Sequence, residues 1–167
     1  MATEETVQLS AAHAPHQASV DAFESILGSL KEELVKLRRD HDSRRSAGFS
    51  TLSLTRSGHE PEYFRAVKHV NDTDLTSFTA RDLESVRVAL SAYGLHLFGK
   101  IRLPAVNNGY MHVRIFGSPK DGTDGSSADE REYSLHSIHT EEVIKEDGER
   151  VYRAIFGRND ELEWFDT

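Results

Sequence analysis

The sequence predicts an α+β fold in which one helix packs on a four- to five-stranded antiparallel sheet. Two observations carry this prediction: a helical repeat of apolar residues near the N-terminus, and alternation of side-chain type in both halves of residues 95–116. Alternation with a period of two is typical of half-buried strands, and helices followed by a run of strands favour the α+β class. The 167 residues are enough for one domain with a sizeable core.

Residues 95–116 are expected to form a hairpin, because two alternating segments flank a turn that contains Pro104 and Asn108-Gly109. One face of this hairpin carries Leu95, Leu97, Ile101, Leu103, Met111, Val113 and Ile115. The other face, here called the sheet-face patch, carries His96, Phe98, Lys100, Arg102, Tyr110, His112 and Arg114.

The sheet-face patch is a candidate surface for a protein partner or an anion. Cross-strand neighbours lie about 5 Å apart, and interleaved basic and aromatic residues are typical of platforms for nucleic acid or anionic ligands. The alternative is an ordinary solvated sheet face, or one covered by the N-terminal helix. Nucleic acid is an unlikely partner for the whole protein, because residues 121–167 hold 14 acidic and 5 basic residues.

Residues 19–45 are predicted to form an amphipathic helix, with Asp21 and Glu24 as an N-terminal capping pair. Its apolar seam recurs at spacings of three and four and consists of Val20, Phe23, Leu27, Leu30, Leu34 and Leu37. Two interpretations stay open. The seam packs on the protein's own sheet, or the Val20–Leu37 helix pairs with a second copy in a homo-oligomer.

The rest of the chain divides by composition. Residues 1–18 are rich in Ala, Gln, Thr and His and are expected to be a disordered arm. Residues 46–60 are rich in Ser, Thr and Arg and are expected to be a linker. The α+β domain then spans residues 61–167.

Residues 80–92 fit two secondary structures. Four residues share one helical face, namely Leu83, Val86, Leu90 and Tyr93. This spacing, with Gly94 as a stop, favours a helix. Val86, Val88 and Leu90 also alternate, so a strand is the alternative. Residues 61–78 likewise fit a helix that starts at Pro61 or an edge strand.

The C-terminal third is expected to add strands and a returning tail. Asp147-Gly148 marks a tight turn between two strand-like segments. Leu162, Trp164 and Phe165 are apolar residues in an acidic end and are expected to fold back onto the domain.

Composition excludes several kinds of site. The chain has no cysteine, which removes disulfides, thiolate zinc sites and cysteine nucleophiles and fits a reducing compartment. The N-terminus lacks the pattern of a secretory signal, so a cytoplasmic location is expected. No apolar run approaches the roughly 20 residues of a membrane span, and no cofactor or metal motif is present.

Histidines and carboxylates leave an enzymatic alternative open. His136 and His139 are three residues apart, so a regular strand would point them to opposite faces and disfavour a shared metal. Glu141 and Glu142 are candidate partners for a histidine in proton transfer within a cavity on a curved sheet. No nucleophile elbow or phosphate-binding glycine loop accompanies them, so a non-enzymatic binding protein is favoured.

Several short segments resemble the stefins, the cysteine-free members of the cystatin superfamily. NNGYMHVRIFGSP, at residues 107–119, resembles the family's fourth strand. Further similar segments, collinear over residues 57–167, are Pro61-Glu62 with Val67 and Val70, Leu83-Glu84-Ser85-Val86, and Asp160-Glu161-Leu162 with Phe165.

The resemblance implies a helix wrapped by an antiparallel sheet, and a wedge that blocks papain-type cysteine proteases through backbone and apolar contacts. Its candidate partner-binding residues are Gly58, Ser91, Ala92, Tyr93, Gly94 and Trp164. Only Gly94 of the family's QVVAG hairpin motif is retained. A cystatin-like inhibitor is the favoured function, ahead of a small-ligand or enzymatic cavity and of a helix-mediated oligomeric scaffold.

Overall fold

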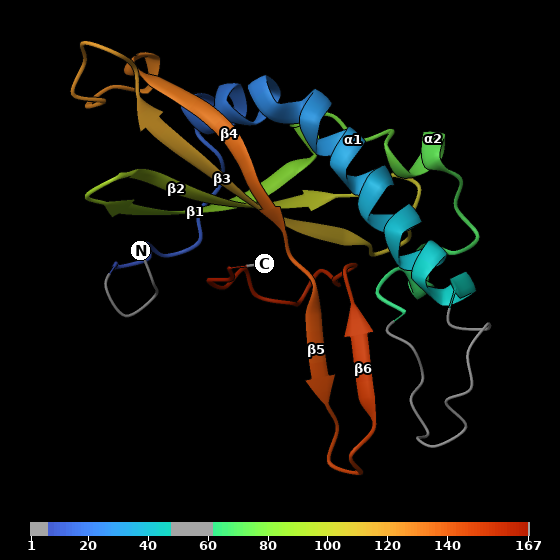
Figure 1. Ribbon diagram of the computed structural model, residues 1–167. Coiled ribbons are helices and arrows are strands. Elements are labelled where there is room, and N and C mark those ends of the chain that lie inside the picture. Colours follow the sequence, from blue (N-terminus) through green and yellow to red (C-terminus); the bar gives the residue numbers. More distant parts are fainter. Residues whose placement is uncertain (1–6, 48–61, 167) are drawn as a thin grey trace.

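Figure 1 shows the computed structural model, in which a long helix lies across one face of an antiparallel sheet. The structure describes residues 7–47 and 62–166. The four-stranded sheet has the order β1-β2-β3-β4, and β5 and β6 form a separate two-stranded sheet. The predicted α+β fold, with a helix on a four-stranded antiparallel sheet, is confirmed. Of the predicted linker at residues 46–60, the first two residues belong to α1, and the remainder, with Gly58, lies outside the described residues.

The elements follow one another as a helix, three short helical turns and then strands. The two α-helices and three-residue 3₁₀ turns that precede the sheet are α1 (Gln17–Ala47), η2 (Arg65–Val67), α2 (Asp72–Leu75) and η3 (Ala80–Asp82). The strands, with one further 3₁₀ turn, are β1 (Leu83–Ser91), β2 (Gly94–Arg102), β3 (Tyr110–Pro119), η4 (Ala128–Glu130), β4 (Arg131–Ile138), β5 (Glu141–Ile144) and β6 (Arg150–Arg153).

The apolar seam of α1 packs on the protein's own sheet. Phe23, Leu30 and Leu34 are fully buried in the main core together with the apolar face of β2 and β3. Gly99 on β2 permits this close approach, since a Cβ there would lie 3.2 Å from the Phe23 ring. Packing within the chain is therefore observed for these three members of the seam, whereas Val20, Leu27 and Leu37 are half-buried.

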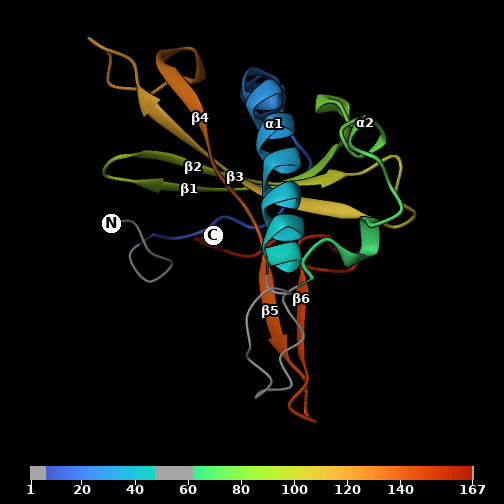
Figure 2. The same cartoon turned by 45° about the vertical axis from the view of Figure 1, so that its right-hand side comes forward.

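Both predicted hairpins are present. β2 and β3 pair antiparallel from Leu95↔Gly117 to Arg102↔Tyr110, as the alternation indicated. β5 and β6 are joined through Gly148, whose φ of 84° is the left-handed conformation that glycine adopts readily. Figure 2 shows this second hairpin projecting away from the main sheet, below the end of α1.

The helix favoured for residues 80–92 is wrong. Residues Leu83–Ser91 form β1, which pairs antiparallel with β2. The pairing shifts between Leu83 and Ser85, which is a β-bulge at Glu84. The extra residue places Leu83 and Val86 in the same core, three positions apart, and so reproduces a helical spacing within a strand.

Residues 61–78 adopt neither the helix nor the edge strand considered for them. The described part of this segment forms only η2 and α2. Asn71 caps α2 by accepting a hydrogen bond from the Asp74 amide at 2.8 Å. Leu75 and Phe78 are fully buried, so the segment serves as a wall of the core.

The prediction of a disordered N-terminal arm is wrong from Val7 onward. The Ser10 amide donates to the Val88 carbonyl at 2.8 Å, and His13 exchanges backbone hydrogen bonds with Val86. Val7 itself is buried. Backbone pairing with the edge of β1 therefore orders this segment, although its composition offers little to bury.

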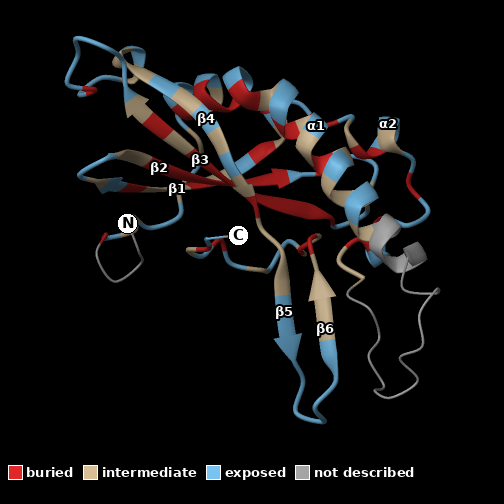
Figure 3. Ribbon diagram, in the orientation of Figure 1, coloured by how far each residue is buried: buried red, intermediate tan, exposed pale blue. Residues whose placement is uncertain are grey.

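The sheet is buried on both faces. Figure 3 shows buried residues throughout its central strands, whereas the β5–β6 hairpin is largely exposed toward its tip. A second, smaller core on the face opposite α1 contains Phe98, Leu162 and Phe165. The C-terminal segment, residues 157–166, thus folds back onto the domain as expected, and Figure 1 shows it on the side of the sheet away from α1.

Leu30 offers a test of the main core. We expect Leu30→Ala to lower the free energy of unfolding by about 3 kcal/mol, because it leaves a cavity between α1 and the sheet. Chemical denaturation measures the change. Glu32→Ala, at an exposed position on the same helix, is the control and should change stability by less than about 0.5 kcal/mol. Equal effects of the two substitutions would contradict the assignment of this face to the core.

Candidate functional site

The turn between β1 and β2 presents two exposed apolar side chains. Leu90 is 66% exposed and Tyr93 is 68% exposed, more than any other large hydrophobic residue that the structure describes. The β1–β2 pairing continues to Ser91↔Gly94, so the turn is held at the end of a fully paired hairpin. Large apolar groups on a rigid, convex turn are suited to contact with another protein.

Ser91 and Gly94 fix the shape of this turn. The Ser91 hydroxyl donates to the Gly94 carbonyl at 3.2 Å and accepts from the Tyr93 amide at 3.3 Å. Gly94 has φ of 150°, and a Cβ there would lie 2.4 Å from the Gly117 carbonyl oxygen. Glycine is thus required sterically at this position, next to β3.

Two further segments lie toward the end of the sheet that carries this turn. The β1–β2 turn and the β3–β4 loop lie at the same end, as they must in an antiparallel meander (Figure 1). The N-terminal segment pairs antiparallel with β1 through the bridges Leu9↔Ala89 and His13↔Val86. Residues that precede Leu9 therefore lie toward the same end of the sheet. The described residues therefore place Val7, Tyr93 and the loop around Gly122 at one edge of the domain.

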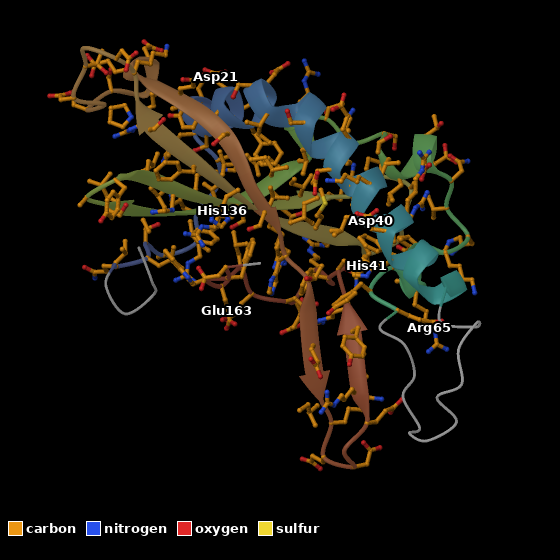
Figure 4. All side chains as sticks on the ribbon, in the orientation of Figure 1. Asp21, Asp40, His41, Arg65, His136 and Glu163 are labelled. Carbon is orange, nitrogen blue, oxygen red and sulfur yellow. The ribbon has the colours of Figure 1, made fainter. Side chains whose placement is uncertain are left out.

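The sheet-face patch is assembled on one face, but it is not an open surface. His96, Lys100, His112 and Arg114 are at most 6% exposed, and Phe98 and Tyr110 are also buried. The C-terminal segment covers them (Figure 4 labels Glu163 on this segment). Arg102 is the exposed member, with an ion pair to Asp82 at 3.3 Å. Because the C-terminal segment covers the sheet-face patch, the interpretation of this patch as a solvent-facing platform is wrong.

Arg114 is the main anchor of the C-terminal segment. Its Nη1 donates to the Phe165 carbonyl at 2.9 Å and to Asp166 Oδ1 at 2.8 Å. The guanidinium also lies over the Trp164 ring, 4.5 Å from the centroid. Trp164, a predicted partner contact, is therefore half-buried against the sheet beside Arg114 and not at the β1–β2 turn.

His96 connects Arg114 to the β1–β2 turn. Arg114 Nη2 lies 3.1 Å from His96 Nδ1, and His96 Nε2 lies 3.0 Å from the Ser91 hydroxyl. Because a guanidinium only donates, Nδ1 must accept and the proton resides on Nε2. Burial, and then the charge of Arg114, lower the pKa of His96 from 6.5 to about 4, which agrees with a neutral ring.

Lys100 fastens the start of the C-terminal segment. Its Nζ donates to the carbonyls of Arg158 at 2.7 Å and Asp160 at 2.6 Å. Burial lowers the pKa of Lys100. Burial opposes ionisation of Asp160, but the Gly157 amide and Arg153 outweigh it and lower the pKa of that carboxyl. Backbone carbonyls thus take the place of an external anion at this lysine.

His112 is the most deeply buried histidine of the patch. Its ring stacks on Phe156 at 4.2 Å between centroids, and its Nε2 has no hydrogen-bond partner among the described residues. Burial, and then the charge of Lys100, lower its pKa from 6.5 to about 3. The neutral ring acts as packing, not as an acid or base near pH 7.

His136 and His139 lie toward the same face, contrary to the expectation for a regular strand. The pairing of β3 with β4 shifts between Arg114↔Ser137 and Ile115↔Leu135, which is a second β-bulge. His139 stacks on Phe165 at 4.3 Å, and the pKa of His136 is lowered by burial and then by Arg114. Figure 4 labels His136 on β4.

The acidic residues considered for proton transfer are paired with arginines. Glu141 Oε2 accepts from Arg153 at 2.5 Å, and Glu142 forms an ion pair with Arg150 at 3.1 Å. Within residues 7–47 and 62–166, no group of three or more His, Cys, Asp or Glu residues is arranged to hold a metal ion. These contacts favour structural roles for both glutamates.

Comparison with known proteins adds no relative. No family model, curated protein or solved structure matches this chain. No helix in the described part of the chain has the length and apolar character needed to cross a membrane.

Sequence reasoning identified Ser91, Ala92, Tyr93 and Gly94 as a unit, and the structure places them together in the β1–β2 turn. It missed Leu90, because the helical reading turned this side chain toward the core. The alternation of Val86, Val88 and Leu90 correctly indicated the strand, but it placed Leu90 on the same face as the buried Val86 and so did not indicate that Leu90 is exposed.

Arg114 offers a test of how the C-terminal segment is held. We expect Arg114→Leu to lower stability by about 3 kcal/mol, because it leaves the Phe165 carbonyl and His96 Nδ1 without their donor. Hydrogen exchange should show reduced protection in residues 158–166. Arg102→Leu is the matched control, since it removes an exposed arginine of the same face and should cost less than about 1 kcal/mol. Unchanged protection in Arg114→Leu would contradict this anchoring.

The lowered pKa of His112 predicts that acid destabilises the fold. Its folded-state pKa of about 3 lies below the ordinary value of 6.5, so between these values the unfolded chain binds a proton that the folded chain does not. Stability should therefore fall as the pH drops below 6.5 and level off near 3. Above this pH range the His112 ring is neutral in the folded and the unfolded chain, so it adds no pH dependence to the stability.

We expect His112→Phe, which keeps the stack on Phe156, to flatten this dependence. The slope of stability between about pH 6 and pH 4 should decrease by on the order of 1 kcal/mol per pH unit. Denaturant titrations at several pH values measure it. His69→Gln, at an exposed histidine, should leave the slope unchanged. An identical slope in His112→Phe and the parent protein would show that His112 is not the sensitive group.

Proposed function

We propose that this protein is a non-enzymatic protein-binding module that inserts the β1–β2 turn into the active-site cleft of a papain-type cysteine protease. The observation that carries the proposal is the exposed pair Leu90 and Tyr93 on a rigid hairpin end. The resemblance of residues 107–119 to a stefin strand supports the choice of protease class. The cytoplasmic location remains a prediction from the cysteine-free composition.

The mechanism of such an inhibitor needs shape and apolar contact, and no chemistry. Tyr93 offers a large amphipathic ring at little conformational cost, which is why aromatic residues dominate protein interfaces. The turn is pre-organised by the hydrogen bonds of Ser91, so little entropy is lost when it docks. The N-terminal segment pairs with β1 as far as Ala89, close to the turn, and so adds to the surface that a partner can contact.

The alternative of a ligand cavity or enzyme on the sheet is not supported at the sheet-face patch. Its side chains pack against the C-terminal segment, and the carboxylates nearby are paired with arginine. A substrate would first have to displace residues 157–166. The exposed end of the hairpin is therefore the better site for a partner.

Titration of papain with the purified protein tests this function. We expect inhibition, and we expect Tyr93→Ser to weaken it by roughly 30-fold, the effect of losing an aromatic anchor at the centre of an interface. Ile144→Ser is the matched control, because Ile144 is 64% exposed at the other hairpin and should leave inhibition unchanged.

Two outcomes overturn the proposal. Absence of papain inhibition at micromolar concentrations would exclude the protease assignment. Equal loss in Tyr93→Ser and Ile144→Ser would show that the β1–β2 turn is not the contact surface.

A further inference from the structure

A cavity of about 280 Å³ lies where the C-terminal half of α1 meets residues 62–72. Its lining shares no residue with the β1–β2 turn or with the sheet-face patch. Figure 4 labels His41 on α1 and Arg65 on the following segment, and both side chains line this cavity. Nothing in the proposed protease contact uses it.

The lining of the cavity is strongly basic. Arg38, Arg39, Arg65 and Lys68 face two carboxylates, Glu62 and Asp72, which leaves a net charge of +2. This basicity stands out in a protein whose formal net charge is −8. An anion that enters the cavity is attracted locally, although the molecule as a whole repels it.

The arginines of α1 already bind an anionic group of this chain, the Asp72 carboxylate. The Arg38 side chain is only 11% exposed, and its Nη1 donates to the Val70 carbonyl at 2.6 Å. Arg38 and Arg39 bind the two oxygens of Asp72, with Arg39 Nη2 at 3.0 Å from Oδ2. These hydrogen bonds lower the pKa of Asp72. Two guanidinium groups thus converge on one oxyanion of this chain, at the wall of a cavity with further cations.

Aromatic side chains form the other part of the lining. The rings of His41 and Tyr63 lie 4.6 Å apart, and those of His41 and Phe64 lie 6.0 Å apart. Tyr63 also contacts Tyr152 of β6 edge-on at 5.2 Å. The cavity therefore joins an aromatic wall to a cationic one, the combination that recognises a ring attached to an anionic group.

We propose that this cavity binds a small aromatic molecule that carries a phosphate group, of the size of a nucleoside monophosphate. A volume of about 280 Å³ is at the lower end for small-molecule sites, which excludes large cofactors. A phosphate monoester carries about −1.5 to −2 charges near neutral pH and so matches the net +2 of the lining better than a single carboxylate. Lys68 and Arg65 are exposed residues of the lining, and the Arg65 guanidinium lies 3.8 Å from the Glu62 carboxylate, so a phosphate would compete with Glu62 for it. In this proposal Lys68 and Arg65 contact the phosphate and the ring lies against Tyr63.

Isothermal titration with adenosine monophosphate, phenyl phosphate and inorganic phosphate tests this site. We expect one saturable site for both aromatic phosphates, and weaker binding of inorganic phosphate. Lys68→Gln and Arg65→Gln should each raise the Kd of adenosine monophosphate by about two- to fivefold, as expected for exposed charge contacts.

Two further variants separate the cavity from general charge effects. Lys36→Gln removes a charge from an exposed position on α1 that is outside the cavity lining, and it should leave the Kd unchanged. Tyr63→Leu should reduce the preference for phenyl phosphate over inorganic phosphate by about two- to tenfold, with thermal unfolding confirming that the variant is folded.

Three results would overturn the proposal: no saturable binding of either aromatic phosphate, equal weakening by Lys36→Gln and Lys68→Gln, or equal affinity for phenyl phosphate and inorganic phosphate. None of these measurements depends on protease inhibition.

Discussion

The hydrogen bonds from Arg114 hold the C-terminal segment over the face of the sheet opposite α1. With α1 on the other face, the sheet is buried on both sides. A buried guanidinium is costly unless it is paired. Here the Phe165 carbonyl, Asp166 and His96 satisfy most of its donors, and only Nε lacks a partner among the described residues. Lys100 uses the same solution with two further carbonyls. The basic face of the hairpin and the last ten described residues therefore require each other.

This arrangement also connects the interior to the exposed turn. Arg114 bonds to His96, His96 bonds to Ser91, and Ser91 sets the β1–β2 turn that presents Tyr93. The link from Arg114 depends on a neutral His96, because a protonated ring cannot accept from a guanidinium. The docking of the C-terminal segment and the shape of the proposed contact surface thus share one hydrogen-bond chain. A turn supported in this way is pre-organised for binding.

The sequence predicted the elements whose side-chain period is regular. The hairpin of β2 and β3 and the seam of α1 follow periods of two and 3.6, and both were identified correctly. Two of the errors fall at β-bulges. At Glu84 a bulge gives strand residues Leu83 and Val86 a helical spacing, and beside Arg114 a bulge brings His136 and His139 to one face. A bulge adds one residue to a strand and so reverses the face to which the following side chains point. A single sequence carries no separate signal for such a bulge.

The candidate site was predictable only in part, and the reason is physical. Alternation shows that His96, Lys100 and Arg114 share a face, but the same alternation describes a solvated face and a covered one. What decides between them is the acidic C-terminal segment. Its apolar residues Leu162, Trp164 and Phe165 predicted that it folds back, but not onto which face. The acceptors that it offers to Arg114 and Lys100 are largely backbone carbonyls, which have no residue-type signature. The cover removes the sheet face from the surfaces open to partners. The two proposed binding surfaces, the apolar β1–β2 turn and the basic, aromatic cavity at the far end of α1, both lie where the cover does not reach.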